Sequence, residues 1–261
     1  MIGMTPLDGD YEFFSAETVE DIILLRFKEN LLVRATDLDT QDTLFNFIGR
    51  ISSQVDIKVV VIINSPQKTG CEEYMEFYRK VYESKFGEYA TERLYNSIDQ
   101  FILKIVNLNK IVVHVDSGKV IPLFMNISLA CDYRIVSENT VFQNPCLELG
   151  LVPKGGSGFF LSKILGRTKA YEIMLSDKDM SAQEALKLGI VNEVVPLEKL
   201  EEISLDRARG FARKPASTLQ GVKRLLGFSL KDLQDYLNLE NEVLIRITKS
   251  FEFNKNVTNI F

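Results

Sequence analysis

Histidine and cysteine, two side chains that often act as a base or a nucleophile, are rare in this chain. Its 261 residues include one histidine, His114, and three cysteines, Cys71, Cys131 and Cys146. A single histidine excludes a metal site with several histidine ligands and leaves any Ser-His-Asp or Cys-His arrangement one possible base. An odd number of cysteines without a Cys-x-x-Cys pair argues against a disulfide framework or a zinc ribbon. We therefore expect no metal site.

Three features have both a chemical and a structural interpretation. His114 lies inside the apolar run Ile111–Val115, which favours a buried core histidine over a catalytic base. Asp116 follows that run and is expected to cap a turn. The stretch Gly155-Gly156-Ser157-Gly158 is glycine-rich but lacks the Gly-Lys-Ser/Thr ending of a P-loop, so we discount a nucleotide-phosphate site there.

The elements that would hold these residues alternate between strands and helices. Apolar, β-branched runs predict strands at Val19–Arg26, Asp56–Asn64, Lys110–Asp116 and Tyr133–Ser137. Helical spacing predicts helices over Thr40–Val55, Glu72–Leu108 (with a possible break at Phe86–Gly87) and Pro122–Asp132. Such alternation indicates parallel strands joined by helical crossovers.

The second part of the chain is nearly all helix. Helices are expected at Lys169–Leu175, Ala182–Leu188, Leu197–Lys214, Ala216–Gly227 and Lys231–Lys249. The predicted fold class is therefore α/β. We expect residues 1–200 to form the α/β core and residues 201–261 a separate helical region.

Composition excludes several classes of protein. The chain is 46% hydrophobic and 26% charged, with a net charge of −5, which is typical of a folded globular protein and unfavourable for nucleic acid or an anionic membrane surface. No apolar run approaches the roughly 20 residues that span a bilayer, and the N-terminus does not have the pattern of a signal peptide. Free thiols suit a reducing compartment, so we expect a cytoplasmic protein.

Residues 109–196 resemble the crotonase (enoyl-CoA hydratase/isomerase) superfamily. The resemblance rests on short motifs at the family's spacings: Cys131-Asp132, Val141-Phe142, Pro145, Leu149-Gly150, Pro153, Leu161 to Gly166, Ala170-Tyr171-Glu172, Ser181–Ala185, Gly189, Val191 and Pro196. It covers about a third of the chain closely and most of the rest loosely.

The resemblance implies a ββα superhelix spiral core and a C-terminal helical trimerisation region, in a homotrimer or hexamer. It also implies an acyl-CoA or acyl-carrier thioester as substrate, with coenzyme A as part of that substrate and no other cofactor. In such enzymes two backbone N–H groups hold the thioester oxygen while an enolate forms, and one or two carboxylates move the protons.

The sequence departs from the family where that chemistry is done. Pro122, Leu123 and Phe124 stand in place of three glycines, and Asn126 stands in place of a glutamate. The second glutamate of the family, which follows a proline, is Cys146 here. Pro122 suits the first turn of a helix, so the helix and the N–H of Leu123 should persist, while Leu123 and Phe124 crowd the site.

In the family a loop carries the second N–H donor of the oxyanion hole. The corresponding loop here, from Asn64 to Glu72, is about two residues shorter. The resemblance makes Thr69 or Lys68 the N–H donor. We take Thr69 and Leu123 as the predicted oxyanion hole and Lys68, Gly70 and Phe124 as predicted substrate-binding residues.

Four side chains are candidates for the missing acid and base. Cys146 could act as a nucleophile or an acid, or could be a small buried hydrophobe. Asn126 could bind substrate or a water, or could simply lie on a helix face. Lys154 follows a proline at a position that faces the acyl group in relatives, but it could also be a solvated loop lysine. Glu148 is the nearest carboxylate that could replace a lost glutamate.

Two functions remain open from the sequence. The chain could be an acyl-thioester hydratase, isomerase or decarboxylase with non-standard acid and base residues. Loss of CO₂ generates an enolate directly, so decarboxylation is the reaction most compatible with the missing glutamates. Alternatively, it could be a catalytically inactive homologue that serves as a structural or regulatory subunit. Side chains of Leu123 and Phe124 that fill the acyl pocket would favour the second.

Overall fold

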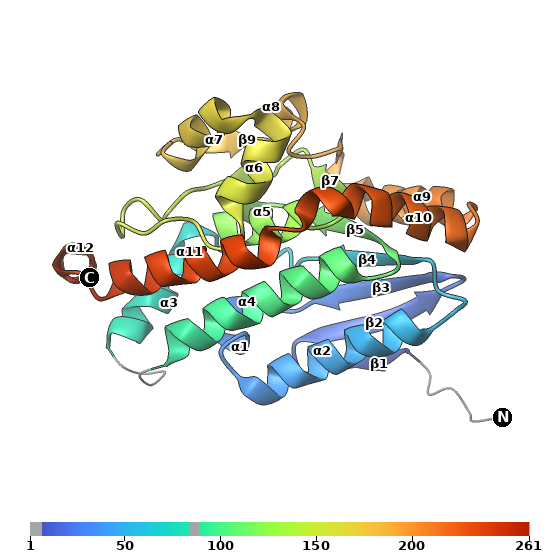
Figure 1. Ribbon diagram of the computed structural model, residues 1–261, viewed down its shortest axis with the longest axis horizontal. Helices are drawn as coiled ribbons and strands as arrows, with labels where there is room; N and C mark the ends of the chain where they lie inside the picture. The colour runs from blue at the N-terminus through green and yellow to red at the C-terminus, as the bar shows by residue number, and fades with distance from the viewer. Residues whose placement is uncertain (1–6, 84–88, 261) are drawn as a thin grey trace.

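The fold is built on a mixed β-sheet. The computed structural model describes residues 7–83 and 89–260. Within those residues the main sheet has seven strands in the order β1-β2-β3-β4-β5-β7-β10 (Figure 1). The strands are β1 (Gly9–Asp10), β2 (Phe14–Val19), β3 (Ile22–Phe27), β4 (Val59–Ile63), β5 (Ile111–Asp116), β7 (Tyr133–Ser137) and β10 (Glu193–Val195).

Strand direction divides the sheet in two. Strands β1, β2 and β3 are antiparallel, whereas β3, β4, β5, β7 and β10 are parallel. The parallel part has the β-branched sequence expected of strands that are buried on both faces, and all six residues of β5 are buried. The carboxyl ends of β3, β4 and β5 therefore meet at one edge.

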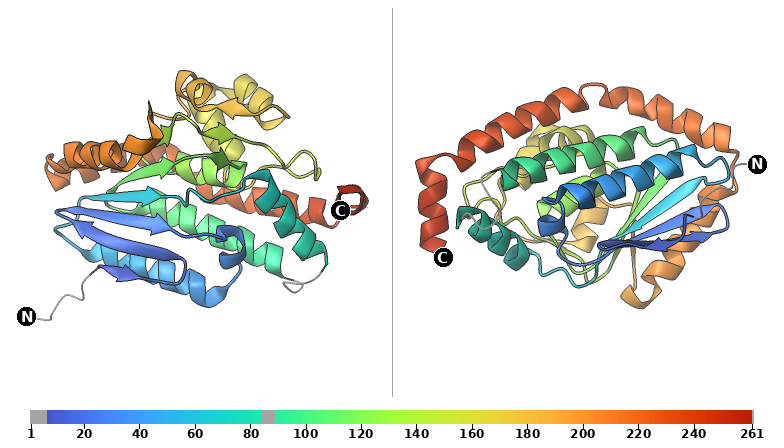
Figure 2. Two further views of the ribbon diagram at one scale, coloured as in Figure 1. Left: turned by 180° about the vertical axis from the view of Figure 1, so that it is seen from behind. Right: turned by 90° about the horizontal axis from the view of Figure 1, so that it is seen from below.

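Helices cover both faces of the sheet (Figure 2). Val60 and Ile62 of β4 pack in the cluster that contains α2 and α4, whereas Val59 and Val61 pack in the cluster that contains α9 and α10. The alternation follows from the two-residue repeat of a strand. The helices before residue 130 are α1 (Leu31–Arg34), α2 (Leu38–Ser53), α3 (Cys71–Tyr82), α4 (Ala90–Asn107) and α5 (Pro122–Leu129).

The later helices surround this core. They are α6 (Ser157–Leu165), α7 (Arg167–Met174), α8 (Ala182–Leu188), α9 (Leu200–Ala212), α10 (Ala216–Gly227), α11 (Leu233–Thr248) and α12 (Phe251–Ile260). Helices α6, α7 and α8 lie beside a small sheet of β6 (Lys119–Val120), β8 (Val141–Phe142) and β9 (Met180–Ser181) (Figure 1). Helix α11 packs on α4, and α12 packs on α3.

The predicted α/β fold with a helical C-terminal region is confirmed, with several corrected boundaries. The strand expected at Val19–Arg26 is β3, but it begins at Ile22, because Val19 ends β2 and the chain turns at Glu20, whose φ is 58°. The expected helix from Pro122 ends at Leu129 rather than Asp132, and the one from Leu197 begins with a 3-10 turn over Leu197–Lys199. The predicted break at Phe86–Gly87 lies outside the described residues. Helix α12 was not predicted.

Candidate active site

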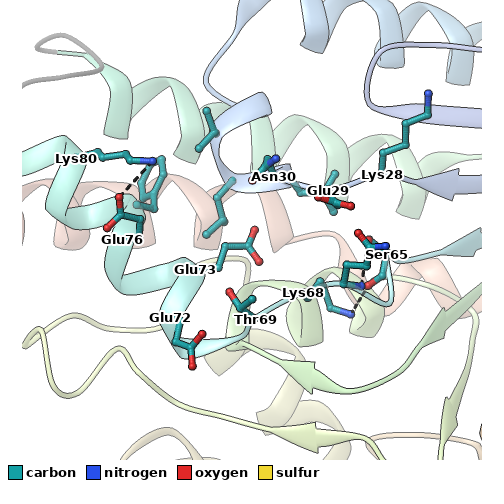
Figure 3. A pocket seen from close by; sticks show the side chains of 15 residues that line it. Lys28, Glu29, Asn30, Ser65, Lys68, Thr69, Glu72, Glu73, Glu76 and Lys80 are labelled. Atoms are coloured by element: carbon teal, nitrogen blue, oxygen red, sulfur yellow. Dashed lines mark hydrogen bonds and ion pairs between the residues drawn. The ribbon is translucent and has the colours of Figure 1, made fainter.

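A cavity of about 370 Å³ opens where β3 and β4 end (Figure 3). Its walls are the segment that follows β3, the loop that follows β4 and one face of α3. Ligands commonly bind outside the carboxyl ends of parallel strands, because loops from neighbouring strands converge there. The lining residues are Lys28 to Val33, Ser65, Gln67, Lys68, Thr69, Glu72, Glu73, Glu76, Phe77 and Lys80.

Lys68 fixes the loop on the floor of this cavity. Its ammonium forms an ion pair with Asp116 at the end of β5 and donates to the carbonyls of Ser65 at 3.1 Å and Ser117 at 3.2 Å. The side chains of Lys68 and Asp116 are only 4% and 2% exposed. All the donors of this ammonium are therefore committed to protein, and Lys68, a predicted substrate-binding residue, holds the loop that carries Thr69.

Gly70 is required by the backbone. It caps α3 with a φ of 70°, and a Cβ atom there would lie 2.7 Å from the Cβ of Lys119. The N–H of Cys71 donates to Gln143 Oε1 at 3.2 Å. Gly70, predicted to bind substrate, is thus placed against the β6 and β8 region.

The two residues of the predicted oxyanion hole border different cavities. Thr69 lines the 370 Å³ cavity, whereas Leu123 and Phe124 line a smaller, apolar cavity of about 70 Å³ between α2, α4 and α5. Leu31 and Leu32 of α1 line both cavities and lie between them. Pro122 occupies the first position of α5 as predicted, and Leu123 and Phe124 are buried.

Asn126 is fully buried and bonded inside the protein. Its Nδ2 donates to the carbonyl of Lys154 at 2.8 Å, and its Oδ1 accepts from Ser157 Oγ at 3.0 Å. Asn126 therefore ties α5 to the start of α6. Both ends of its amide have protein partners in this arrangement.

Cys146 lies in a buried row of tyrosines. Its thiol donates to the hydroxyl of Tyr74 at 3.3 Å, and the hydroxyls of Tyr78 and Tyr95 are 2.8 Å apart. Burial raises the pKa of Cys146 to about 12 and also raises the pKa of Tyr74. The thiol is therefore protonated near neutral pH and closed off from solvent, which leaves it a weak nucleophile.

Lys154 is buried rather than solvated. Its ammonium donates to Glu240 Oε2 at 2.9 Å and forms an ion pair with Asp99, and the three side chains are at most 7% exposed. Asn241 donates to the other oxygen of Asp99 at 2.7 Å. Desolvation raises the pKa of Asp99 to about 6, although Lys154 acts in the opposite direction. Glu148, in contrast, is exposed, and it lines none of the described cavities.

His114 is a core residue, as its apolar surroundings suggest. Its Nε2 lies 3.3 Å from Asn64 Nδ2, and the same amide nitrogen donates to Asp116 Oδ2 at 2.7 Å. Burial lowers the pKa of His114 to about 4, so the ring is neutral near pH 7. Among the described residues, no three His, Cys, Asp or Glu side chains gather as a metal ion would require.

Glu73 is the site residue that the sequence analysis did not single out. It faces the 370 Å³ cavity from α3, and desolvation raises the pKa of its carboxyl above the ordinary value of 4.5. Helical spacing was the available signal, because Glu73, Glu76, Phe77 and Lys80 fall on one face of α3 and line the same cavity. This face of α3 contains none of the family's motif positions.

Comparison with known proteins defines the class. The family described as enoyl-CoA hydratase/isomerase matches residues 20–259. The chain therefore belongs to the enoyl-CoA hydratase/isomerase family, as its motifs predicted. No helix among residues 7–83 and 89–260 is long and apolar enough to cross a membrane.

Individual relatives match parts of the chain. The trans-2-decenoyl-[acyl-carrier-protein] isomerase of Streptococcus mutans is 28% identical over 166 residues, which are 63% of each chain. The carnitinyl-CoA dehydratase of Shigella flexneri is 34% identical over 113 residues, 43% of this chain and 42% of that one. The chain thus spans less than two thirds of the length of these curated relatives.

Solved structures share the fold over nearly the whole chain. An enoyl-CoA hydratase from Bacillus halodurans superposes with a TM-score of 0.79 at 18% identity, covering 95% of this chain and all of that one. An enoyl-CoA hydratase from Mycobacterium avium subsp. paratuberculosis gives 0.79 at 20% identity, covering 97% of each.

Proposed function

We propose that this protein binds an unsaturated acyl thioester and shifts its double bond by moving one proton, without adding water. Hydration needs groups that activate a water and protonate the substrate, whereas a double-bond shift needs one base that removes and returns a proton. The observation that carries this proposal is the burial of Asn126 and Cys146. The side chains at both family glutamate positions are closed inside the protein and bonded there.

The proposed thioester lies in the 370 Å³ cavity, with its oxygen on the N–H of Thr69. The N–H of Leu123, at the second position of α5, is the second donor, and the dipole of α5 adds to its field. Leu31 and Leu32 must move aside for both donors to reach one oxygen. They belong to a four-residue helix, too short to be stable by itself.

Two further features of the proposal come from the family. The thiol carrier, coenzyme A or an acyl carrier, is part of the substrate, and the reaction needs no other cofactor. Assembly through the C-terminal helices into a trimer or hexamer, and a cytoplasmic location, stay predictions.

The second candidate is a catalytically inactive subunit, and one observation favours it. Leu123 and Phe124 are buried where relatives have glycine, and the cavity beside them is only about 70 Å³. That volume is too small for an acyl chain without movement of the side chains.

Parallel incubations separate these functions. The purified protein would be supplied with β,γ-hexenoyl-CoA in one sample and α,β-hexenoyl-CoA in another, and the products separated by chromatography. We expect conversion of the first to the α,β isomer and no hydroxyacyl product from either. A hydroxyacyl product would overturn the proposal, and binding of both thioesters with no conversion would favour the inactive subunit.

A further inference from the structure

Four carboxylates line the cavity beside Thr69, and they differ in solvent exposure and in their ion pairs. Glu29 and Glu72 are exposed to solvent, and Glu76 forms ion pairs with Arg79 and Lys80. Glu73 is half-buried, and no hydrogen bond or ion pair joins it to another described residue. It is therefore the carboxylate of this cavity that is both shielded from water and uncommitted to a protein partner.

Its position suits contact with a ligand. Glu73 is the third residue of α3, one helical turn from the loop that carries Thr69. Figure 3 shows its carboxyl turned away from the α3 ribbon and towards the middle of the cavity. The buried side chains of Leu32 and Phe77 line the same cavity, so a bound thioester would exclude water from the carboxyl.

Nearby charges leave this carboxyl available as a base. Desolvation is the larger influence and raises the pKa of Glu73, while the ammonium of Lys68 lowers it. The ammonium of Lys68 is bonded to Asp116, Ser65 and Ser117. Its positive charge therefore acts on Glu73 from a distance, without forming an ion pair with it. A partly desolvated carboxyl in a cleft is a common form of catalytic base.

We propose that Glu73 is the residue that transfers the proton in the double-bond shift. The Glu73 carboxylate removes a proton from Cα of a β,γ-unsaturated thioester, and the electron pair of that C–H bond moves to form a dienolate. The protonated carboxyl then returns the proton to Cγ, which leaves a Cα–Cβ double bond and a carboxylate. Atoms and electrons balance without a co-reactant. This inference rests on the proposed function.

The test compares Glu73→Gln and Glu73→Asp with the wild type. Glutamine keeps the size of the side chain but cannot take up a proton, and aspartate keeps the acid but shortens its reach. The matched control is Glu242→Gln, the same change at an exposed position of α11. Each protein would be incubated in D₂O with β,γ-hexenoyl-CoA, and NMR would follow deuterium at Cα and Cγ and formation of the isomer.

We expect Glu73→Gln to lower the rate by about 10²-fold or more, the usual contribution of a positioned acid or base, with thioester binding retained. Glu73→Asp should keep part of the rate and move the acidic limb of its pH profile, and Glu242→Gln should match the wild type. Wild-type rates in Glu73→Gln would overturn the assignment of Glu73. A wild type that binds no acyl thioester, judged by isothermal calorimetry, or that binds one without isomerising it, would instead overturn the proposed function.

Discussion

The carboxylate of Glu240 accepts a hydrogen bond from the ammonium of Lys154 at 2.9 Å. The same carboxylate accepts the N–H groups of Gly155 at 2.8 Å and Gly156 at 2.9 Å. Helix α11 thus holds the turn that starts α6, and Asn126 is bonded to both ends of that turn. A lysine that the family resemblance placed towards the acyl group is instead part of the structural interior.

Replacing Lys154 by methionine should destabilise the protein strongly. The change leaves the carboxylates of Asp99 and Glu240 buried without their cation, and breaking a buried pair in this way costs about 3–5 kcal/mol. Urea denaturation followed by circular dichroism would measure the loss.

The control for this change is Lys169→Met. Lys169 pairs with Glu172 on the surface of α7, where both side chains are about half exposed. Surface pairs contribute under about 1 kcal/mol. An equal effect of the two substitutions would contradict the structural role of Lys154.

His114 should stay neutral throughout the physiological range. It is the one histidine in the chain, so its ring resonances need no assignment by mutation. With a pKa of about 4 instead of 6.5, the ring should show no titration in NMR spectra between pH 5 and 8. A titration midpoint near pH 6.5 would show that the ring is accessible to water.

The same residue should make stability depend on pH. Below pH 6.5 His114 takes up a proton in the unfolded chain, whereas in the folded protein it does so only near pH 4. The contribution of His114 to the free energy of unfolding is therefore complete above pH 6.5 and is lost as the pH falls towards 4. The loss from this residue is about 3 kcal/mol. Asp99, whose pKa is raised, acts in the opposite direction between pH 4 and 6. The comparison is therefore between the wild type and His114→Leu. The free energy of unfolding of His114→Leu should fall less on acidification than that of the wild type. Equal pH dependence of the two free energies would contradict this prediction.

The three thiols should differ in reactivity. Cys71 is partly exposed, whereas Cys131 and Cys146 are buried and burial raises the pKa of each to about 12. A disulfide reagent should modify Cys71 alone in the folded protein and all three thiols in denaturant, as counted by mass spectrometry. Rapid modification of Cys146 in the folded state would show that this thiol is accessible to solvent.

Much of the fold could be predicted from the sequence, because it follows from local patterns. The runs that form β4, β5 and β7 are β-branched and apolar, and Pro122 marks the start of α5. Strand β2 was missed because half of its residues are polar, and the turn at Glu20 has no glycine to mark it. At the candidate site, motif positions predict that Asn126 and Cys146 replace the family's two glutamates, and this stays a prediction. The partners of Lys154 could not be predicted, because Asp99 and Glu240 lie 55 and 86 residues away in the sequence.

Replacing Phe124 by alanine should lower the stability of the protein and enlarge the cavity beside it. Phe124→Ala removes a buried ring next to the 70 Å³ cavity, which should cost about 3–5 kcal/mol. If Phe124 limits the acyl group, as its predicted substrate-binding role requires, the variant should bind longer acyl-CoA thioesters more tightly than the wild type. Calorimetric titration with butyryl-CoA and octanoyl-CoA would measure this, and an unchanged preference would place the acyl chain elsewhere.

The central claim is that this member of the family moves a proton on an acyl thioester without adding water. The most direct measurement is NMR of β,γ-hexenoyl-CoA with the wild-type protein in D₂O. We predict accumulation of the α,β isomer, with no hydroxyacyl signal. A hydroxyacyl product, or a bound thioester that is never isomerised, would contradict the claim.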